Sequence, residues 1–176
     1  MEEQVNVLCV DDEPNVLRAL ERLFLDNDYN ILAATSGAEG LDILKKTSPV
    51  QLVMSDYRMP EMNGVTFLKE VSLLWPDTVR IVLSGYADTG SIISAINEGH
   101  IYKFIPKPWN DDELIVTVST ALERYRLQKR NLELTNELLC KNEELTKLNA
   151  ELNGKNEELT KLNAELKALL IRNGQK

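Results

Sequence analysis

Residues 5–14 read VNVLCVDDEP, a short and largely apolar run that ends in two aspartates, a glutamate and a proline. A run this short and apolar is typical of a strand that is buried on both faces of a parallel sheet. Pro14, directly after two acidic residues, favours the first turn of a helix. The stretch therefore predicts a strand over residues 5–10, then a cluster of carboxylates, then a helix.

Four more short apolar runs follow, separated by segments with apolar residues at three- and four-residue spacing. This alternation predicts a parallel sheet with helices on both faces, an α/β fold. The predicted strands cover residues 5–10, 30–34, 52–55, 79–84 and 101–105. The predicted helices cover residues 14–25, 38–46, 64–74 and 89–97, and a fifth begins near Asp111.

The charge of the 176 residues divides unevenly along the chain. Residues 1–122 carry 19 acidic and 9 basic side chains (net −10), and residues 123–176 carry 9 and 11 (net +2), which together give −8. All six prolines and nine of the ten aromatic residues also lie before residue 123. We therefore expect one folded domain over residues 1–122 and a different structure over residues 123–176. The acid excess argues against a nucleic-acid-binding surface.

The sequence shows no sign of membrane insertion or of a disulfide framework. Its start, MEEQ, lacks a basic region, and no apolar run approaches the roughly 18 residues that span a bilayer. Cys9 and Cys140 are the only cysteines. We expect a cytoplasmic protein without membrane contact.

The C-terminal part is a heptad repeat. KNEELTKLNAEL occurs at residues 141–152 and again at 155–166, an offset of 14 residues or two heptads. No Pro or Gly interrupts residues 111–153, so the fifth helix is expected to continue into this part. With Leu145 at position a, Leu occupies ten of thirteen consecutive a and d positions, and Asn131, Lys141 and Lys155 occupy the others.

These positions predict a coiled coil between chains. The expected seam comprises Leu127, Asn131, Leu134, Leu138, Leu145, Leu148, Leu152, Leu159, Leu162, Leu166 and Leu169. An Asn at one a position favours two parallel strands, so we expect a parallel homodimer. The alternative is a helical spacer without a fixed partner.

Polar side chains stand at the ends of four predicted strands. Asp11 and Asp12 follow the first strand, Asp56 the third, Ser84 ends the fourth and Lys107 follows the fifth. Because the carboxyl ends of parallel strands meet at one edge of a sheet, these groups should converge. Clustered carboxylates repel unless a cation neutralises them, and Mg²⁺ prefers such oxygen ligands. The set suits phosphoryl transfer, with Asp56 as nucleophile and Lys107 and Ser84 on the phosphoryl oxygens.

At this point the sequence resembles the receiver domain of two-component response regulators. The resemblance rests on VLCVDDEP at 7–14, SDYRMPEMNG at 55–64, LSG at 83–85 and KFIPKPW at 103–109, and it covers about residues 4–122. It implies the flavodoxin-like five-stranded fold, phosphorylation of Asp56 by a histidine kinase, and Mg²⁺ held by Asp12, Asp56 and the Arg58 carbonyl, with Asp11 acting through a bound water. It also implies a cis Lys107-Pro108 bond.

The resemblance implies further roles. Ser84 and Phe104 would be the switch pair that moves on phosphorylation and reshapes the face made by the fourth helix, fifth strand and fifth helix. Arg58 and Tyr86 lie at positions that tune the dephosphorylation rate, and we expect their bulk to shield the acyl phosphate. Such a chain is a regulator of an effector that the sequence does not identify, not an enzyme acting on external substrates.

Two other functions compete with this one. A phosphorelay or phosphate-sink protein would use the coiled coil only for dimerisation, and transfer from Asp56 to a separate histidine-containing protein would distinguish it. A Mg²⁺-dependent phosphohydrolase would use Asp56 for turnover, but Asp56 is followed by Tyr57 and Arg58 and so does not begin the DxD pattern of aspartate-based phosphatases.

Overall fold

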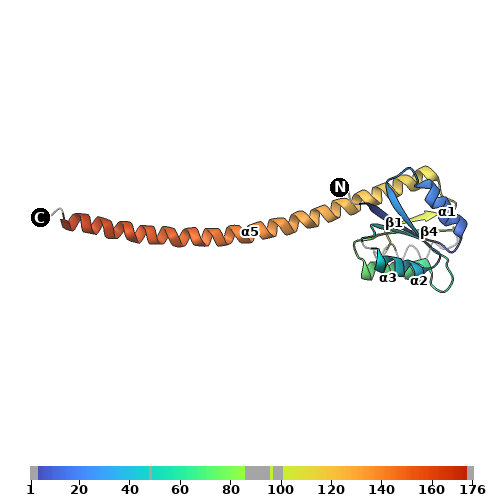
Figure 1. Cartoon of the computed structure of the whole chain (residues 1–176), viewed down its shortest axis with the longest axis horizontal. Helices are drawn as coiled ribbons and strands as arrows, with labels where there is room; N and C mark the ends of the chain where they lie inside the picture. The colour runs from blue at the N-terminus through green and yellow to red at the C-terminus, as the bar shows by residue number, and fades with distance from the viewer. Residues whose placement is uncertain (1–3, 48, 86–95, 97–100, 174–176) are drawn as a thin grey trace. The chain divides into compact units, whose positions relative to one another are not determined.

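A computed structural model of the chain describes residues 4–47, 49–85, 96 and 101–173. The chain divides into two compact units, Met1–Gln128 and Lys129–Lys176. The first unit is an α/β domain, and the second is the continuation of its last helix (Figure 1). Each unit is described below by itself.

The α/β domain contains one parallel sheet in the order β2-β1-β3-β4-β5. The strands are β1 Val5–Val10, β2 Tyr29–Ala34, β3 Leu52–Asp56, β4 Val79–Ser84 and β5 Lys103–Pro106. This order is that of flavodoxin-like folds, so the predicted fold class is confirmed. The fifth strand begins at Lys103, two residues later than predicted, and ends at Pro106.

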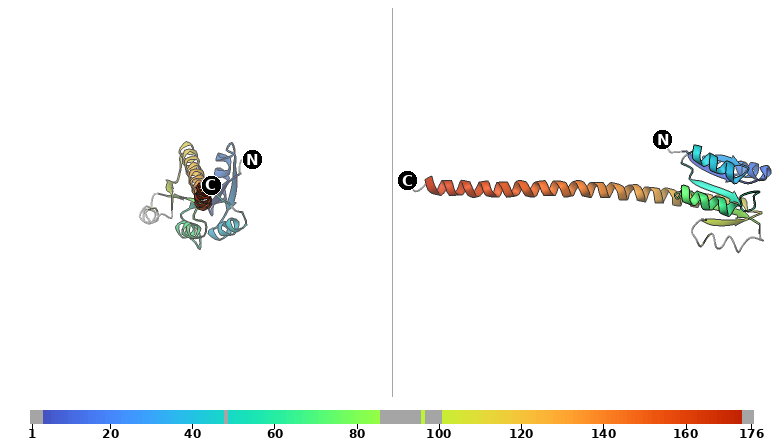
Figure 2. Two further views of the ribbon diagram at one scale, coloured as in Figure 1. Left: turned by 90° about the vertical axis from the view of Figure 1, so that its left-hand side faces the viewer. Right: turned by 90° about the horizontal axis from the view of Figure 1, so that it is seen from below.

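The helices cover the sheet on both faces. They are α1 Pro14–Leu23, α2 Gly37–Lys46, α3 Gly64–Leu74 and α5 Asp111–Asn173. Apolar side chains of α1 and of the first turns of α5 pack on one face, and those of α2 and α3 pack on the other. Figures 1 and 2 show the ribbons of α2 and α3 on the opposite side of the sheet from α1. The predicted helix over residues 89–97 lies outside the described residues except for Ile96, which is helical.

Local sequence explains where the helices begin. The Ser36 hydroxyl accepts a hydrogen bond from the Glu39 N–H at the start of α2, and the Asn63 side chain accepts one from the Thr66 N–H at the start of α3. α1 ends at Leu23, two residues before the predicted end, and Leu25 beyond it is 80% exposed. The apolar pattern continued past the point where the chain turns toward β2.

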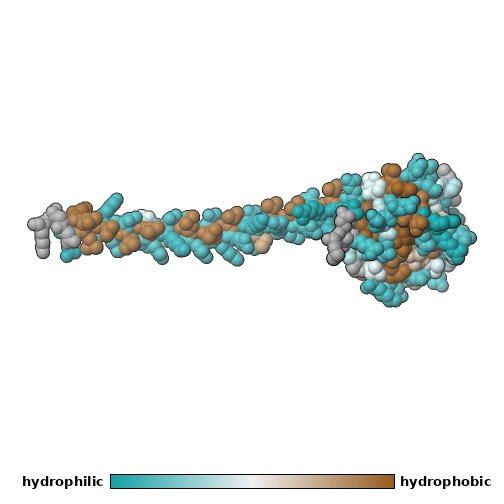
Figure 3. Space-filling view, turned by 45° about the horizontal axis from the view of Figure 1, so that its top comes forward, coloured by the Kyte–Doolittle hydropathy of each residue, from teal (hydrophilic) through white to brown (hydrophobic). Residues whose placement is uncertain are grey.

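α5 is a single helix of 63 residues. Its start is capped by Asn110, whose side chain accepts a hydrogen bond from the Glu113 N–H at 3.0 Å. Leu114, Val118 and Leu122 of its first turns are buried in the α/β core. From Lys129 onward every described residue of α5 is exposed, and apolar side chains lie along its surface (Figure 3).

Candidate functional site

The site is built at the carboxyl edge of the sheet. Val10 pairs with Ser55, Asp56 with Leu83, and Ser84 with Pro106, so β1, β3, β4 and β5 end at the same level. The residue after β1 is Asp11, the last residue of β3 is Asp56, and Lys107 follows β5. The sheet register therefore brings together side chains that are up to 96 positions apart in sequence.

Lys107 joins two carboxylates. Its Nζ lies 2.7 Å from Asp11 Oδ2 and 2.5 Å from Asp56 Oδ1. Asp11 is 1% exposed and Asp56 is 7% exposed. One ammonium thus bridges two buried acids that would otherwise repel each other.

Backbone amides fix both carboxylates. Asp11 Oδ1 accepts a hydrogen bond from the Glu13 N–H at 2.9 Å, and Asp56 Oδ2 accepts one from the Arg58 N–H at 2.7 Å. Each acid therefore directs one oxygen at Lys107 and the other at the loop that follows it. The oxygens are held in place before any phosphoryl group arrives, which is the preorganisation that phosphoryl transfer needs.

Burial and the contacts between Lys107 and the two acids shift the pKa values of Asp11 and Lys107. Burial raises the pKa of Asp11 above its usual range, and the hydrogen bonds and charge of Lys107 offset this only in part. Burial also disfavours the charge on Lys107, but its bonds to Asp11 and Asp56 outweigh that effect, so the pKa of the lysine is raised. Lys107 is therefore a fixed cation at the pH of the cell.

Asp12 does not join this group. Its side chain is exposed, and the described residues contain no set of three Asp, Glu, His or Cys side chains that could hold a metal ion together. Asp11 and Asp56 still offer two carboxylates from neighbouring strands, and Mg²⁺ is commonly bound by one or two carboxylates while it keeps several waters. The donor set therefore fits Mg²⁺ through two protein carboxylates and water.

The other predicted residues lie around this pair. Ser84 is buried, and its hydroxyl donates to the Gly85 carbonyl oxygen at 3.2 Å. Arg58 is exposed beside Asp56, and Tyr86 lies outside the described residues. The Lys107-Pro108 peptide bond is cis, as the resemblance implied.

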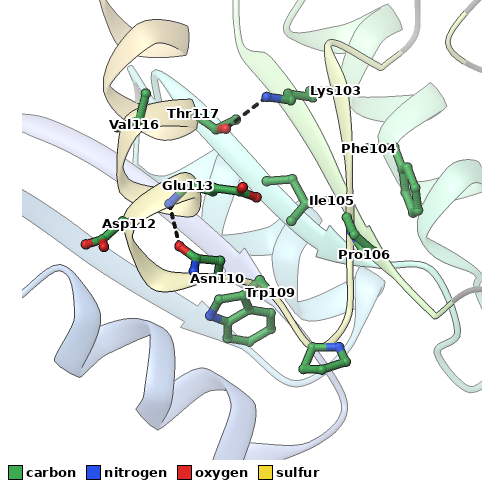
Figure 4. Close-up of a pocket in the computed structure, with 11 residues that line it drawn as sticks. Lys103, Phe104, Ile105, Pro106, Trp109, Asn110, Asp112, Glu113, Val116 and Thr117 are labelled. Carbon is green, nitrogen blue, oxygen red and sulfur yellow. Dashed lines mark hydrogen bonds between the residues drawn. The ribbon is translucent and has the colours of Figure 1, made fainter.

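Phe104 lies at a pocket between β5 and the start of α5. The pocket has a volume of about 690 Å³, and its lining includes Phe104, Trp109 and Thr117. Lys103 and Phe104 leave β5 on opposite sides, with Lys103 donating a 3.0 Å hydrogen bond to Thr117 (Figure 4). The pocket is lined by residues of β5 and α5, two of the three elements whose surface is predicted to change when Ser84 and Phe104 move.

Gly64 is a functional residue that sequence reasoning missed. A Cβ at this position would lie 1.9 Å from the Asp56 carbonyl oxygen, and the Gly64 N–H donates to the Tyr57 carbonyl oxygen at 2.9 Å. The start of α3 therefore rests directly on the backbone of Asp56. The Asn63-Gly64 pair after the acidic strand end was the available signal, because a glycine at a helix start permits this approach.

Comparison with known proteins agrees with this geometry. The family model described as the response regulator receiver domain matches residues 7–119. The chain belongs to this receiver family. Over 127 residues it is 46% identical to the hydrogenase transcriptional regulatory protein HoxA of Cupriavidus necator, a match that covers 72% of this chain and 26% of that protein. The chain thus spans about a quarter of the length of the curated relatives that it matches.

Solved structures resemble the receiver closely. An uncharacterized protein from Neptuniibacter caesariensis has a TM-score of 0.70 at 44% identity, covering 74% of this chain and 96% of that one. The signal receiver domain of an HD domain-containing protein from Pseudomonas fluorescens has a TM-score of 0.67 at 35% identity, covering 70% and 98%. No helix in the described part of this chain is long and apolar enough to cross a membrane.

Proposed function

We propose that the chain is a phosphorylation switch of a two-component system, working in the cytoplasm, in which a histidine kinase phosphorylates Asp56. The observation that carries this proposal is the shared hydrogen bonding of Lys107 to Asp11 and Asp56 at the sheet edge. In the transfer, a carboxylate oxygen of Asp56 forms a bond to phosphorus as the bond between phosphorus and the donor histidine nitrogen breaks.

The residues of this chain divide the work. Asp56 is the nucleophile, and the Arg58 N–H orients its second oxygen. Lys107, which contacts Asp56 before transfer, would bind the phosphoryl oxygens after it and balance their negative charge. Asp11 and Asp56, with the Arg58 carbonyl and water, would hold Mg²⁺, and the exposed Asp12 would join them only by turning toward the sheet edge. When bound, the ion would neutralise negative charge on the phosphoryl oxygens.

The switch would begin at Ser84 and Phe104. Once Asp56 carries a phosphoryl group, its oxygens become acceptors for the Ser84 hydroxyl, which would then leave the Gly85 carbonyl. Phe104 is half-buried and packs with the apolar cluster on the α2–α3 side of the sheet, so its movement inward would change the surface beside β5. One new charge would thus bias a two-state element. The side chains of Arg58 and Tyr86 would shield the acyl phosphate from water.

The output would pass through α5. The helix begins in the receiver core and continues to Asn173 without a break. Its seam leucines are 41–63% exposed in the single chain, and we propose that a parallel homodimer buries them. Phosphorylation would then change the geometry of two paired helices and so control an effector.

The proposal is tested at Asp56. The chain is incubated with a small acyl-phosphate donor and Mg²⁺, and intact mass is measured for the unaltered protein, Asp56→Asn and the matched surface variant Asp77→Asn. One added phosphoryl group is expected on the unaltered protein and on Asp77→Asn, and none on Asp56→Asn. An unmodified parent protein, or a modified Asp56→Asn, would overturn the assignment.

A further inference from the structure

Two rows of polar residues flank the seam of α5. Position g carries the glutamate row, which consists of Glu137, Glu144, Glu151, Glu158 and Glu165. Position e carries the asparagine row, which consists of Asn142, Asn149, Asn156 and Asn163. All nine side chains are exposed in the single chain and lie beside the exposed leucines. In a coiled coil, e and g residues determine which partner and which orientation are accepted.

An antiparallel pair would place the glutamate row against itself. In two-stranded antiparallel coils the g positions of the two helices face each other. Two antiparallel alignments overlap the seams equally, over twelve a and d positions. In the first, Glu144 would lie against the partner's Glu151 and Glu137 against the partner's Glu158; in the second, Glu144 would lie against the partner's Glu158 and Glu137 against the partner's Glu165. Each of these contacts would occur twice in the dimer, and like charges at such positions destabilise the pairing. Arg130 against the partner's Glu165 would be a favourable contact in the first alignment only.

A parallel pair removes this repulsion. There, each g residue faces the e residue five positions later in the partner, so Glu137 would face the partner's Asn142 and Glu144 the partner's Asn149. The same relation holds for the next two glutamates. An asparagine amide can donate a hydrogen bond to a carboxylate and carries no charge. The two rows are therefore compatible in a parallel dimer and conflict in an antiparallel one.

The polar residues within the seam select the register. With two parallel chains in register, Asn131, Lys141 and Lys155 each face the same residue of the partner, and ten leucine layers form. The repeat permits a slip of 14 residues, but only five leucine layers then remain and Asn131 would face a leucine. Either antiparallel alignment likewise places all three polar residues against leucines. Matching polar layers, as with a buried Asn pair, fix register.

The structure shows how a seam lysine is neutralised. Lys141 Nζ lies 2.9 Å from Glu137 Oε1, one helical turn earlier on the same chain. Glu151 precedes Lys155 by the same four residues. In the in-register dimer each lysine layer would therefore contain two lysines with two glutamates supplied by the same helices, and the long aliphatic stems can carry the ammonium groups outward.

From these observations we infer that the partner of α5 is a second copy of this chain, parallel and in register, and that the glutamate row is the feature that rejects the antiparallel pairing. This inference rests on the coiled-coil dimer of the proposed function. It is independent of phosphorylation at Asp56, so the two can fail separately.

Disulfide capture tests the inference on the full chain. Cys140→Ser removes the exposed thiol, and Cys9 is fully buried with a thiol pKa raised to about 12. In this background, Leu134→Cys should cross-link to itself on mild oxidation. Mixtures of Leu134→Cys with Leu159→Cys and with Leu166→Cys report the two antiparallel alignments, and a mixture with Leu148→Cys reports the 14-residue slip. We expect the Leu134→Cys homodisulfide to exceed each mixed disulfide by about tenfold or more.

A charge variant tests the cause without altering the seam. Glu144→Lys would turn the two Glu144 contacts of the antiparallel dimer from repulsive to attractive, so the Leu134–Leu159 type of mixed disulfide should rise severalfold. Glu143→Lys makes the same charge change at the outer f position and should leave the ratio unchanged. Sedimentation of the Cys140→Ser parent should show a dimer.

Each outcome has a meaning. Dominant homodisulfide together with the response to Glu144→Lys supports the inference. A dominant mixed disulfide, a monomer or a higher oligomer in sedimentation, or equal responses to Glu144→Lys and Glu143→Lys, overturns it. Intact-mass phosphorylation of the same proteins shows whether the receiver remains functional in every case.

Discussion

The receiver and the C-terminal part of α5 use leucine in opposite ways. Leu52 and Leu114 are fully buried in the receiver core, whereas the ten seam leucines of α5 remain 41–63% exposed. Burial of a leucine contributes about 1.5–3 kcal/mol. The receiver therefore obtains its stability within one chain, and the helix needs a partner to obtain the same contribution.

Cysteine and lysine show the same contrast. Cys9 is fully buried, and burial together with the charges of Glu21 and Asp11 raises the pKa of its thiol to about 12, whereas Cys140 is exposed. Lys107 is held between two buried acids, whereas the Lys141–Glu137 pair is exposed on both sides. An exposed pair contributes little to stability in a single chain. The reactivity of Cys140 and the contribution of the Lys141–Glu137 pair to stability therefore depend on whether a partner helix packs against α5.

The largest expected effect comes from removing a seam leucine. Leu152→Ala deletes two buried side chains per dimer, so we expect the free energy of dimerisation to fall by about 4–10 kcal/mol at roughly 2–5 kcal/mol each. Sedimentation equilibrium measures the loss, and thermal unfolding of the receiver should be unchanged. Leu139→Ala is the matched control at an outer position, because Leu139 is equally exposed at 58% in the single chain. Equal weakening by both variants would show that the seam is misplaced.

The next effect concerns the receiver alone. Gly64→Ala would place a methyl group 1.9 Å from the Asp56 carbonyl oxygen and 3.0 Å from the Ser55 hydroxyl oxygen, and the fixed Asp56 backbone leaves no room for it. We expect a loss of about 3 kcal/mol or more in the free energy of unfolding, together with loss of phosphorylation. Urea denaturation measures the first and intact mass the second. Gly37→Ala is the control, since its nearest neighbour is the flexible Met62 side chain at 3.0 Å. A stable, phosphorylated Gly64→Ala protein would contradict the close approach.

The sequence was sufficient to predict the sheet and the residues at its edge. Strands buried on both faces are nearly continuous apolar runs, so they can be recognised in the sequence. The polar residues at the ends of β1, β3 and β5 are Asp11, Asp56 and Lys107. Strand and helix ends were less exact, because tertiary packing decides them. β5 begins at Lys103, although the apolar run begins at Ile101, which is buried without being part of the strand.

Contacts between distant segments could not be predicted. Asp11 and Asp12 are neighbouring residues of the same type, and nothing in the sequence around them distinguishes their side chains. In the structure Asp11 is buried and contacts Lys107, whereas Asp12 is exposed. The Arg124 guanidinium lies 5.3 Å from the centre of the Tyr102 ring, a cation–π contact between α5 and the residue before β5. Such contacts depend on the direction of side chains in three dimensions, which periodicity does not specify.

A smaller effect is expected from Lys107→Met. Two buried acids lose their shared cation, so we expect the free energy of unfolding of the receiver to fall by about 2 kcal/mol at neutral pH, within the range of about 1–3 kcal/mol for a buried group left without its hydrogen-bond partner. The pKa of Asp11 is already raised by burial, and without Lys107 two influences that lower it are gone. A carboxyl whose pKa is higher in the folded state destabilises that state once it is ionised. The difference in free energy of unfolding between Lys107→Met and the unaltered protein should therefore shrink as the pH falls through the folded pKa of Asp11.

The measurement is urea denaturation in the presence of a chelator from neutral pH downward. Lys103→Met serves as the control, because Lys103 is an exposed lysine of β5 that donates a hydrogen bond to Thr117 and touches neither Asp11 nor Asp56. Its stability should change by less than about 0.5 kcal/mol. A deficit for Lys107→Met that grows as the pH falls would contradict the pairing.

The smallest effect returns to the helix. Gly154 lies within α5, and apart from its chain neighbours and the helix's own backbone no atom of the described residues lies within 4 Å of a Cβ built at this position. Gly154→Ala should therefore stabilise the helix by about 1 kcal/mol per chain, because alanine loses less backbone entropy. The reverse change Ala168→Gly, at the same outer c position two heptads later, should cost the same amount. Circular dichroism of the coiled-coil melting transition measures both. If Gly154→Ala lowered the melting temperature, position 154 would have to face another helix, and the heptad phase that places Leu145 at position a would be wrong.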